Sequence, residues 1–274
     1  MAFRFTLLRA LLSIGLTNAA PPLFESEKIH LTTADLAKLS PGGANLLRFG
    51  SRASLNSTTR RCKVYPGDDA WPFEASWSQL NDIVDGQLIS KPRPQAASCY
   101  LGPEYDAAKC TALTNSWNIS YIHLEDPIEM MSPVYQGLTC VPPNIYDSRN
   151  CTSGGFPLYV INATTPKHIQ AGVNFARNTG VRLVIRNTGH DFSGKSGGAD
   201  SLSIWTHHFK DITYIPVHVD KSQSYSGPAF KAGVGVQAYE IYKAASEKGR
   251  VVVGGEGQVS WRSTPLYTIV LTYN

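Results

Sequence analysis

A glycine- and serine-rich stretch at residues 187–198 has the residue types best suited to holding a bound anion. Glycine tolerates positive φ and has no side chain, so such a loop can bring several backbone N–H groups against one phosphate. Ser193 and Ser196 add hydroxyl donors. The glycines of the stretch are Gly189, Gly194, Gly197 and Gly198. The stretch predicts a phosphate or pyrophosphate cradle, although ordinary surface loops have similar compositions.

Periodic patterns on either side of this loop predict the elements that position it. Residues 158–161 and 181–185 have the apolar pattern of short strands, and a helix between them is expected to start at Thr165–Pro166 and stop at Gly180. The remaining expected elements are strands at 202–205, 229–233 and 251–253 and helices at 33–39, 77–84 and 238–247. This alternation predicts an α/β or α+β domain from about residue 155 onward.

Two motifs around the loop carry a specific resemblance. Residues 186–194 read Arg-Asn-Thr-Gly-His-Asp-Phe-Ser-Gly, and residues 201–207 read Ser-Leu-Ser-Ile-Trp-Thr-His. They resemble the PCMH-type FAD-binding domain of the berberine-bridge-enzyme-like FAD-linked oxidases, which are flavoproteins of the vanillyl-alcohol-oxidase (VAO) type, and in particular the fungal secreted members. The resemblance covers about residues 62–256. It implies an α+β fold, with an incomplete PCMH-type domain after a loop-rich, disulfide-bonded segment.

The resemblance also implies a cofactor and a chemistry. FAD would be linked covalently through His190, which occupies the position of the family's flavin-bonding histidine; a structural or solvated histidine is the alternative. The implied cofactor-binding residues are Arg186, Asn187, Thr188, Gly189, His190, Asp191, Ser193, Gly194, Ser196, Gly254 and Gly255. The implied reaction passes a hydride from an alcohol, a sugar or a secondary metabolite to FAD and the electrons then to O2. No catalytic base is identified, because in this family it comes from the substrate domain.

A second glycine motif and a second class of function compete with this interpretation. Residues 233–238 match GxGxxA, and together with Glu256 they have the form of a Rossmann dinucleotide fingerprint, a pattern that often arises by chance. Neighbouring His207 and His208 are expected on opposite faces of a strand, so we interpret them as structural and predict no metal site. The rival function is that of a secreted, non-catalytic glycoprotein with an empty loop.

The chain departs from the family pattern near its end. After Val253-Gly254-Gly255-Glu256 comes Gly257, where the family has a cysteine that forms a second bond to the flavin. The resemblance is lost over residues 257–274, and the family's substrate domain does not follow. The expectation is therefore a truncated gene model or a pseudogene product, with a genuine short protein that lost catalysis as the alternative.

The leader and the glycosylation sequons predict secretion. Residues 1–20 resemble a signal peptide, because Arg4 precedes an apolar stretch and Thr17-Asn18-Ala19 fits a cleavage site. A disordered or mitochondrial-type leader is the alternative. Four Asn-X-Ser/Thr sequons indicate an exposed, secreted surface. Their asparagines are Asn56, Asn118, Asn150 and Asn162.

The cysteines support the same compartment. Cys99 and Cys110 lie eleven residues apart, as do Cys140 and Cys151, and turn-forming residues flank each pair. In an oxidising compartment this spacing predicts two local disulfides, with free buried thiols as the alternative. The fifth cysteine, Cys62, has no predicted partner.

Composition sets the remaining limits. The 274 residues are 42% hydrophobic and 17% charged, with a formal net charge of +4 and scattered basic residues. Neither a nucleic-acid partner nor a membrane span is expected, and we expect a monomer that acts on a small molecule and O2. The predicted parts are a signal peptide at 1–20, a loop-rich segment at 21–154, a partial FAD-binding domain at 155–256 and a non-homologous tail at 257–274.

Overall fold

The computed structural model describes residues 21–50, 62–131, 137–147, 150–220, 224–254 and 267–273. The predictions for the leader at 1–20, for Asn56 and for Gly255 lie outside the described residues. None of the helices in the described ranges is long and apolar enough to cross a membrane.

The first sheet has the strand order β1-β2-β4-β3. Its strands are β1 (Leu88–Ser90), β2 (Tyr159–Asn162), β4 (Leu202–Trp205) and β3 (Leu183–Arg186). Strand β1 is antiparallel to β2, whereas β2, β4 and β3 are parallel to one another. Helix α6 (Pro166–Thr179) connects β2 to β3. The predicted strand–helix–strand unit is confirmed, with β3 beginning two residues later than predicted.

Helix α6 begins and ends where the sequence indicates. Thr165 is its N-cap residue with extended backbone, Pro166 lies in the first turn, and Gly180 ends the helix with a φ of 81°. Gly172 faces the sheet so closely that an added Cβ would meet Ile161 Cδ1 at 2.8 Å. The helix therefore packs its buried face directly onto β2 and β4.

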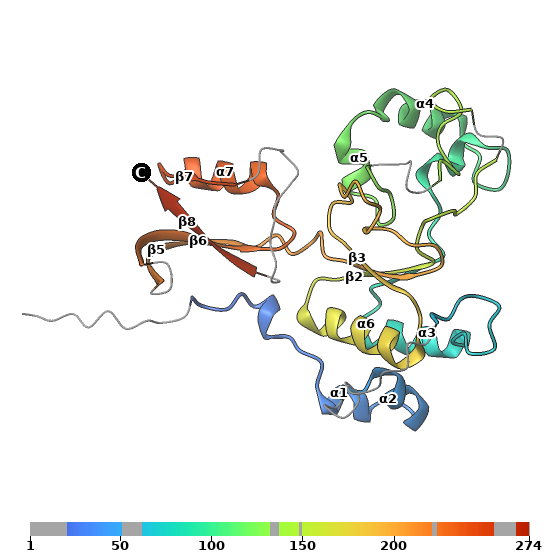
Figure 1. The fold of residues 1–274 in the computed structure, drawn as a ribbon, viewed down its shortest axis with the longest axis horizontal. Helices are drawn as coiled ribbons and strands as arrows, with labels where there is room; N and C mark the ends of the chain where they lie inside the picture. The colour runs from blue at the N-terminus through green and yellow to red at the C-terminus, as the bar shows by residue number, and fades with distance from the viewer. Residues whose placement is uncertain are drawn as a thin grey trace, which may run out of the picture.

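Helix α3 (Glu74–Ile83) shares this face of the sheet (Figure 1). The ring of Trp77 stacks on Tyr159 of β2, with 3.6 Å between ring centroids, and lies 4.8 Å from the ring of Phe175 in α6. Leu47 at the end of α2 (Pro41–Leu47) joins the same core, as does Leu31. Residues on both sides of position 155 thus form one hydrophobic core.

The segment 21–154 contains more helix than predicted. Besides α1 (Thr33–Ala37) and α3, which were expected, it forms α2, α4 (Ala107–Ser116) and α5 (Ser120–Leu124). Helix α4 is cross-linked at Cys110 to Cys99, with Cα atoms 4.8 Å apart. The second disulfide joins Cys140 and Cys151. Both predicted disulfides are confirmed, and Cys62 is an exposed free thiol.

The second sheet has the strand order β5-β6-β8-β7, with helix α7 (Ala238–Ser246) on one side (Figure 1). Its strands are β5 (Ile212–Asp220), β6 (Tyr225–Gly233), β8 (Tyr267–Tyr273) and β7 (Val251–Val252). Strand β5 was not predicted. Strand β8 comes from the predicted tail, yet it lies between β6 and β7. The predicted non-homologous tail at 257–274 thus contributes residues 267–273 to this sheet as a strand that was not predicted.

The antiparallel pairing of β6 argues against the Rossmann alternative, which requires a parallel βαβ unit. Gly233 and Gly235 have a packing role instead. A Cβ at either position would collide with a backbone carbonyl, that of Phe209 or that of His207 respectively. These glycines let the turn after β6 lie against residues 206–209.

An N-terminal strap, residues 22–31, connects the two sheets. Lys231 of β6 forms a buried ion pair with Glu27, donates to the carbonyl of Pro22 at 2.9 Å and lies 4.5 Å from the ring centroid of Phe24. At its other end, the strap accepts a hydrogen bond from Lys167 N–H at the carbonyl of Ile29 (3.0 Å). One short segment thus contacts both β6 and α6.

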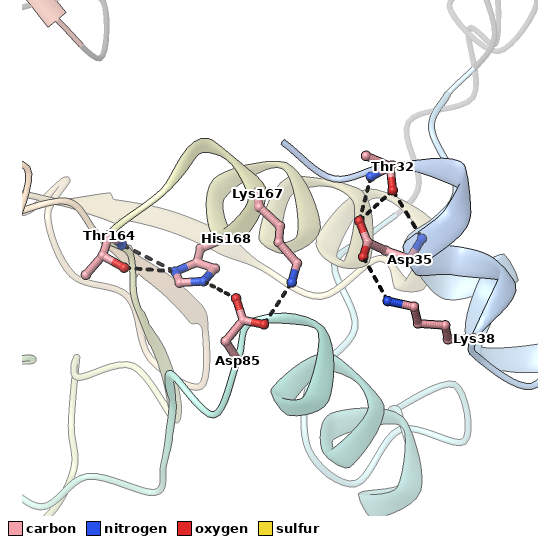
Figure 2. Close-up of polar contacts among 7 residues, drawn as sticks. All are labelled: Thr32, Asp35, Lys38, Asp85, Thr164, Lys167 and His168. Atoms are coloured by element: carbon pink, nitrogen blue, oxygen red, sulfur yellow. Dashed lines mark hydrogen bonds and ion pairs between the residues drawn. The ribbon is translucent and has the colours of Figure 1, made fainter. Parts of the chain in front are cut away.

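A polar cluster holds the N-terminus of α6 (Figure 2). The amide of Thr164 donates to Nδ1 of His168 at 3.3 Å, so Nε2–H of the ring donates to Asp85 at 3.1 Å. Lys167 donates to the other oxygen of Asp85 at 2.8 Å. Figure 2 also shows the capping box between Thr32 and Asp35 at the start of α1. The arrangement around α6 requires a neutral imidazole.

We predict that Phe175→Ala lowers the free energy of unfolding by about 3–5 kcal/mol, because it leaves a cavity beside Trp77. Phe175 is fully buried, whereas Phe73 is 80% exposed, so Phe73→Ala is the matched control. Denaturant unfolding of both variants checks this. Equal losses in the two variants would contradict the assignment of Phe175 to the core.

We also predict a loss of stability on mild acidification. Burial lowers the pKa of His168 despite its bonds to Asp85, so the unfolded chain takes up the proton first, near pH 6.5. The contribution of His168 to the free energy of unfolding is therefore complete above that pH and is lost as the pH decreases through it. His123 contributes in the opposite sense: burial opposes its charged form, but Glu129 and the carbonyl of Trp117 outweigh this and raise its pKa. Burial also lowers the pKa of His207 and His208, so His168→Gln should remove only part of this dependence.

Denaturant unfolding between pH 7.5 and pH 5.5, for the parent and the variant, measures this dependence. His30→Gln, at an exposed position, is the control and should keep the parental slope. An unchanged slope in His168→Gln would contradict the prediction.

Candidate functional site

The glycine-rich loop leaves the carboxyl end of β3 and returns to β4. Its base is held on two sides: Asn187 Nδ2 donates to the carbonyl of Val234 at 2.6 Å, and Trp205 Nε1 donates to the carbonyl of Asn187 at 3.0 Å. Asn187 therefore joins the first sheet to the turn after β6. Its Oδ1 atom is buried without a hydrogen-bond partner among the described residues.

Arg186, the last residue of β3, has only 1% of its surface exposed. Its Nε donates to the carbonyl of Glu129 at 2.9 Å, and its Nη2 donates to the carbonyls of His123 (2.6 Å) and Thr188 (3.4 Å). The guanidinium carbon lies 5.5 Å from the ring centroid of Trp205. Arg186 was predicted to bind the cofactor; its described bonds go to backbone carbonyls and fix the loop to residues 123–129.

Three carboxylates surround this buried cation. Burial lowers the pKa of Arg186 to about 10, although Asp126, Glu129 and Glu125 favour the charged form. The guanidinium is thus charged at neutral pH. Burial and the proximity of Glu129 raise the pKa of Asp126. No motif in the sequence pointed to residues 123–131. The signal that could have found them is the acid-rich run Glu125, Asp126 and Glu129 beside apolar residues.

Gly189, which is buried, and His190 lie in the first half of the loop. Gly189 has a φ of 80°, and its carbonyl accepts from Met131 N–H at 3.0 Å. The hydrogen bonds between described residues do not engage the N–H groups of Gly189 or His190. The side chain of His190 is half-buried, and Thr188 is buried. Two adjacent amides and an imidazole are thus brought together at the end of β3.

Asp191 occupies the second half of the loop. Its carboxylate accepts from Ser193 N–H (3.2 Å), from the Ser193 hydroxyl (2.8 Å) and from Lys195 N–H. Burial opposes ionisation, but these bonds and one from the Ser196 amide outweigh it and lower the pKa of Asp191. Ser193 and Ser196 were predicted to serve a phosphate directly. In this structure the Ser193 hydroxyl and the amides of both serines serve the Asp191 carboxylate.

The other predicted site residues lie apart from this centre. Gly194 has a φ of 71° at the turn that Asp191 closes. Gly254 is exposed and follows β7 of the second sheet. Gly197 and Gly198 pack against Met130 and Arg182, so they serve close packing of the loop.

The two neighbouring histidines, His207 and His208, were predicted on a strand. They lie instead in the turn after β4. His207 Nε2 is 3.1 Å from Glu125 Oε1, and His208 Nδ1 is 2.6 Å from Asn162 Oδ1. Each imidazole thus has its own partner. Within the described ranges, no group of three His, Cys, Asp or Glu side chains is arranged to hold a metal ion.

We predict that Gly189→Ala is more destabilising than an alanine at another glycine with positive φ. A Cβ at Gly189 would lie 2.9 Å from the carbonyl oxygen of Glu129 and 3.0 Å from Arg186 Nε, so it would disturb the hydrogen bond between these two groups. Gly249 has a φ of 63° with open space around it. Gly249→Ala should cost only the backbone strain of about 1–2 kcal/mol. Chemical denaturation measures both; equal costs would contradict the packing argument.

Comparisons with known proteins agree with this geometry. A family model described as FAD binding domain matches residues 157–258. The VAO-type flavoprotein oxidase VAO615 of Thermothelomyces thermophilus is 40% identical over 222 residues, covering 77% of this chain and 38% of that protein. The FAD-linked oxidoreductase ZEB1 of Gibberella zeae is also 40% identical over 222 residues, covering 80% and 38%. The chain thus spans 38% of the length of these curated relatives.

Solved structures give the same result. The VAO-type flavoprotein MtVAO615 from Myceliophthora thermophila C1 superposes with a TM-score of 0.66 at 41% identity, over 71% of this chain and 35% of that one. MtVAO713 from the same fungus superposes with a TM-score of 0.67 at 28% identity, over 74% and 36%. This chain belongs to the VAO-type family of FAD-linked oxidoreductases, and its residues 157–258 match the FAD-binding domain.

Proposed function

We propose that this chain supplies the flavin-holding part of an FAD-linked oxidase, with His190 as the point of covalent attachment. The observation that carries the proposal is the pair of uncommitted amides at Gly189 and His190, placed beside the half-buried imidazole at the carboxyl end of β3. Ligands of open parallel sheets bind at this end of the strands. The family model covers the same residues.

The residues present fit a dinucleotide diphosphate in the first half of the loop. The N–H groups of Gly189 and His190 are available to an anion, and positive φ at Gly189 turns the backbone toward it. The buried, unpartnered Oδ1 of Asn187 can accept from a hydroxyl or N–H group of the cofactor, not from its diphosphate. Asp191 keeps the second half of the loop closed through its own hydrogen bonds. These residues bind and orient the cofactor.

When bound, FAD supplies the redox chemistry: it accepts a hydride from an alcohol, a sugar or a secondary metabolite, and the electrons then go to O2. The chain's own part is to hold the cofactor. His190 tethers it, and Arg186 fixes the start of the loop by its hydrogen bonds to the carbonyls of Glu129 and His123. The catalytic base and the substrate pocket are assigned to the portion of the relatives that this chain does not span. We further propose a secreted monomer, in line with the two disulfides.

Replacing His190 tests the tether. The chain is produced with FAD available, denatured and weighed by intact mass spectrometry after the glycans are removed. The parent is expected to keep the mass of FAD, whereas His190→Ala should lose it, because no other side chain is assigned to the bond. His218→Ala, on β5, is the matched control and should keep the flavin mass.

A parent without flavin mass would refute the covalent tether. If the native parent also shows no flavin absorbance, the chain does not hold FAD, and the non-catalytic glycoprotein remains as its function.

A further inference from the structure

Three of the four sequons lie in the described residues, and their surroundings differ. Asn118 is exposed in the turn after α4, and Asn150 is exposed beside the Cys140–Cys151 disulfide. Asn162 is half-buried at the end of β2 and lies in register with Trp205 of β4. The fourth, Asn56, is outside the described ranges. These environments distinguish which asparagines can carry a glycan in the folded chain.

Both polar atoms of the Asn162 side chain are engaged in the folded structure. Its Nδ2, the atom that would carry the sugar, donates to Gln87 Oε1 at 3.1 Å. Its Oδ1 lies 2.6 Å from His208 Nδ1. A sugar on Nδ2 would replace one of its two hydrogens and add bulk at a half-buried position between Gln87 and the turn after β4. We therefore expect folded molecules to be unmodified at Asn162.

A cavity of about 520 Å³ lies directly beside Asn150. Both disulfide-bonded loops contribute to it, through Cys99 and Cys151. One part of its lining is apolar and includes Leu101, which is 91% exposed. Another part is the Arg93–Glu104 ion pair, with 3.2 Å between nitrogen and oxygen. Pro103 and Pro143 also line the cavity.

This combination suits an N-acetylhexosamine. Such a sugar has a C–H face that packs on leucine and proline, together with hydroxyl and acetamido groups that bond to a guanidinium and a carboxylate. Covering Leu101 would remove exposed apolar surface from water, which is favourable. We propose that Asn150 carries an N-linked glycan whose first N-acetylglucosamine lies in this cavity, and that Asn162 carries none.

The modification requires a lipid-diphosphate-linked oligosaccharide as co-reactant. Nδ2 of Asn150 forms a C–N bond to the anomeric carbon, the bond from that carbon to the lipid diphosphate breaks, and Nδ2 loses one proton. Disulfides form in the same oxidising compartments, and both disulfide-bonded loops border the cavity. This proposal is independent of flavin binding.

Glycan mapping is the first test. The full chain is secreted from a eukaryotic host, purified as folded protein and treated with peptide N-glycosidase in water labelled with a heavy oxygen isotope, which marks each formerly glycosylated asparagine. Label is expected at Asn150 and not at Asn162. An unlabelled Asn150 or a labelled Asn162 would overturn the proposal.

Thermal unfolding then tests the place of the first sugar. Trimming the glycans to a single N-acetylglucosamine should leave the melting temperature unchanged, whereas Asn150→Gln should lower it by about 2 °C or more. Thr152→Ala, which removes the sequon but keeps Asn150, should behave like Asn150→Gln. Thr152→Ser keeps the sequon and should match the parent.

The matched control at another exposed sequon is Asn118→Gln, which should leave the melting temperature unchanged. If the melting temperature of the trimmed protein is as low as that of Asn150→Gln, the first sugar does not lie in the cavity and the proposal is wrong.

Discussion

The guanidinium of Arg186 places a positive charge in the interior where three segments of the chain meet. Removing such a charge from water is costly unless hydrogen bonds and opposite charges compensate for it. Three backbone carbonyls accept from it, and Asp126, Glu129 and Glu125 supply the negative charge. Residues 123–129, the end of β3 and the start of the loop are therefore held as one unit, and the position of His190 depends on that unit.

The loop itself divides its anion-binding capacity between two partners. The amides that follow Asp191 bond to its carboxylate, so the protein supplies its own anion there. The amides of Gly189 and His190, which precede Asp191, are those that the proposed function assigns to the diphosphate. An ionised Asp191 puts a negative charge at the start of the second half of the loop, which disfavours an anion near Ser196, because like charges repel.

Local signals in the sequence were sufficient for part of this structure. Pro166 and Gly180 predicted the two ends of α6 because their backbone preferences act within a few residues. The spacing of the cysteine pairs predicted both disulfides. Contacts between segments that are distant in sequence could not be predicted in this way. Arg186 was named as a cofactor-binding residue from the resemblance alone, and its bonds to the carbonyls of Glu129 and His123 could not be predicted, because those residues lie about sixty positions away in sequence. Strand β8 was missed because its partner β6 lies far upstream.

The N-terminal strap has a consequence for the order of folding. Glu27 and Lys231 are 204 positions apart, so their ion pair cannot form until most of the chain has left the ribosome. The first sheet and α6 can assemble earlier, since β2, α6, β3 and β4 are close in sequence. Contacts of such separation form slowly because a long loop must close first. Docking of the second sheet is therefore a late event, and until then the strap-facing side of β6 is open to other chains.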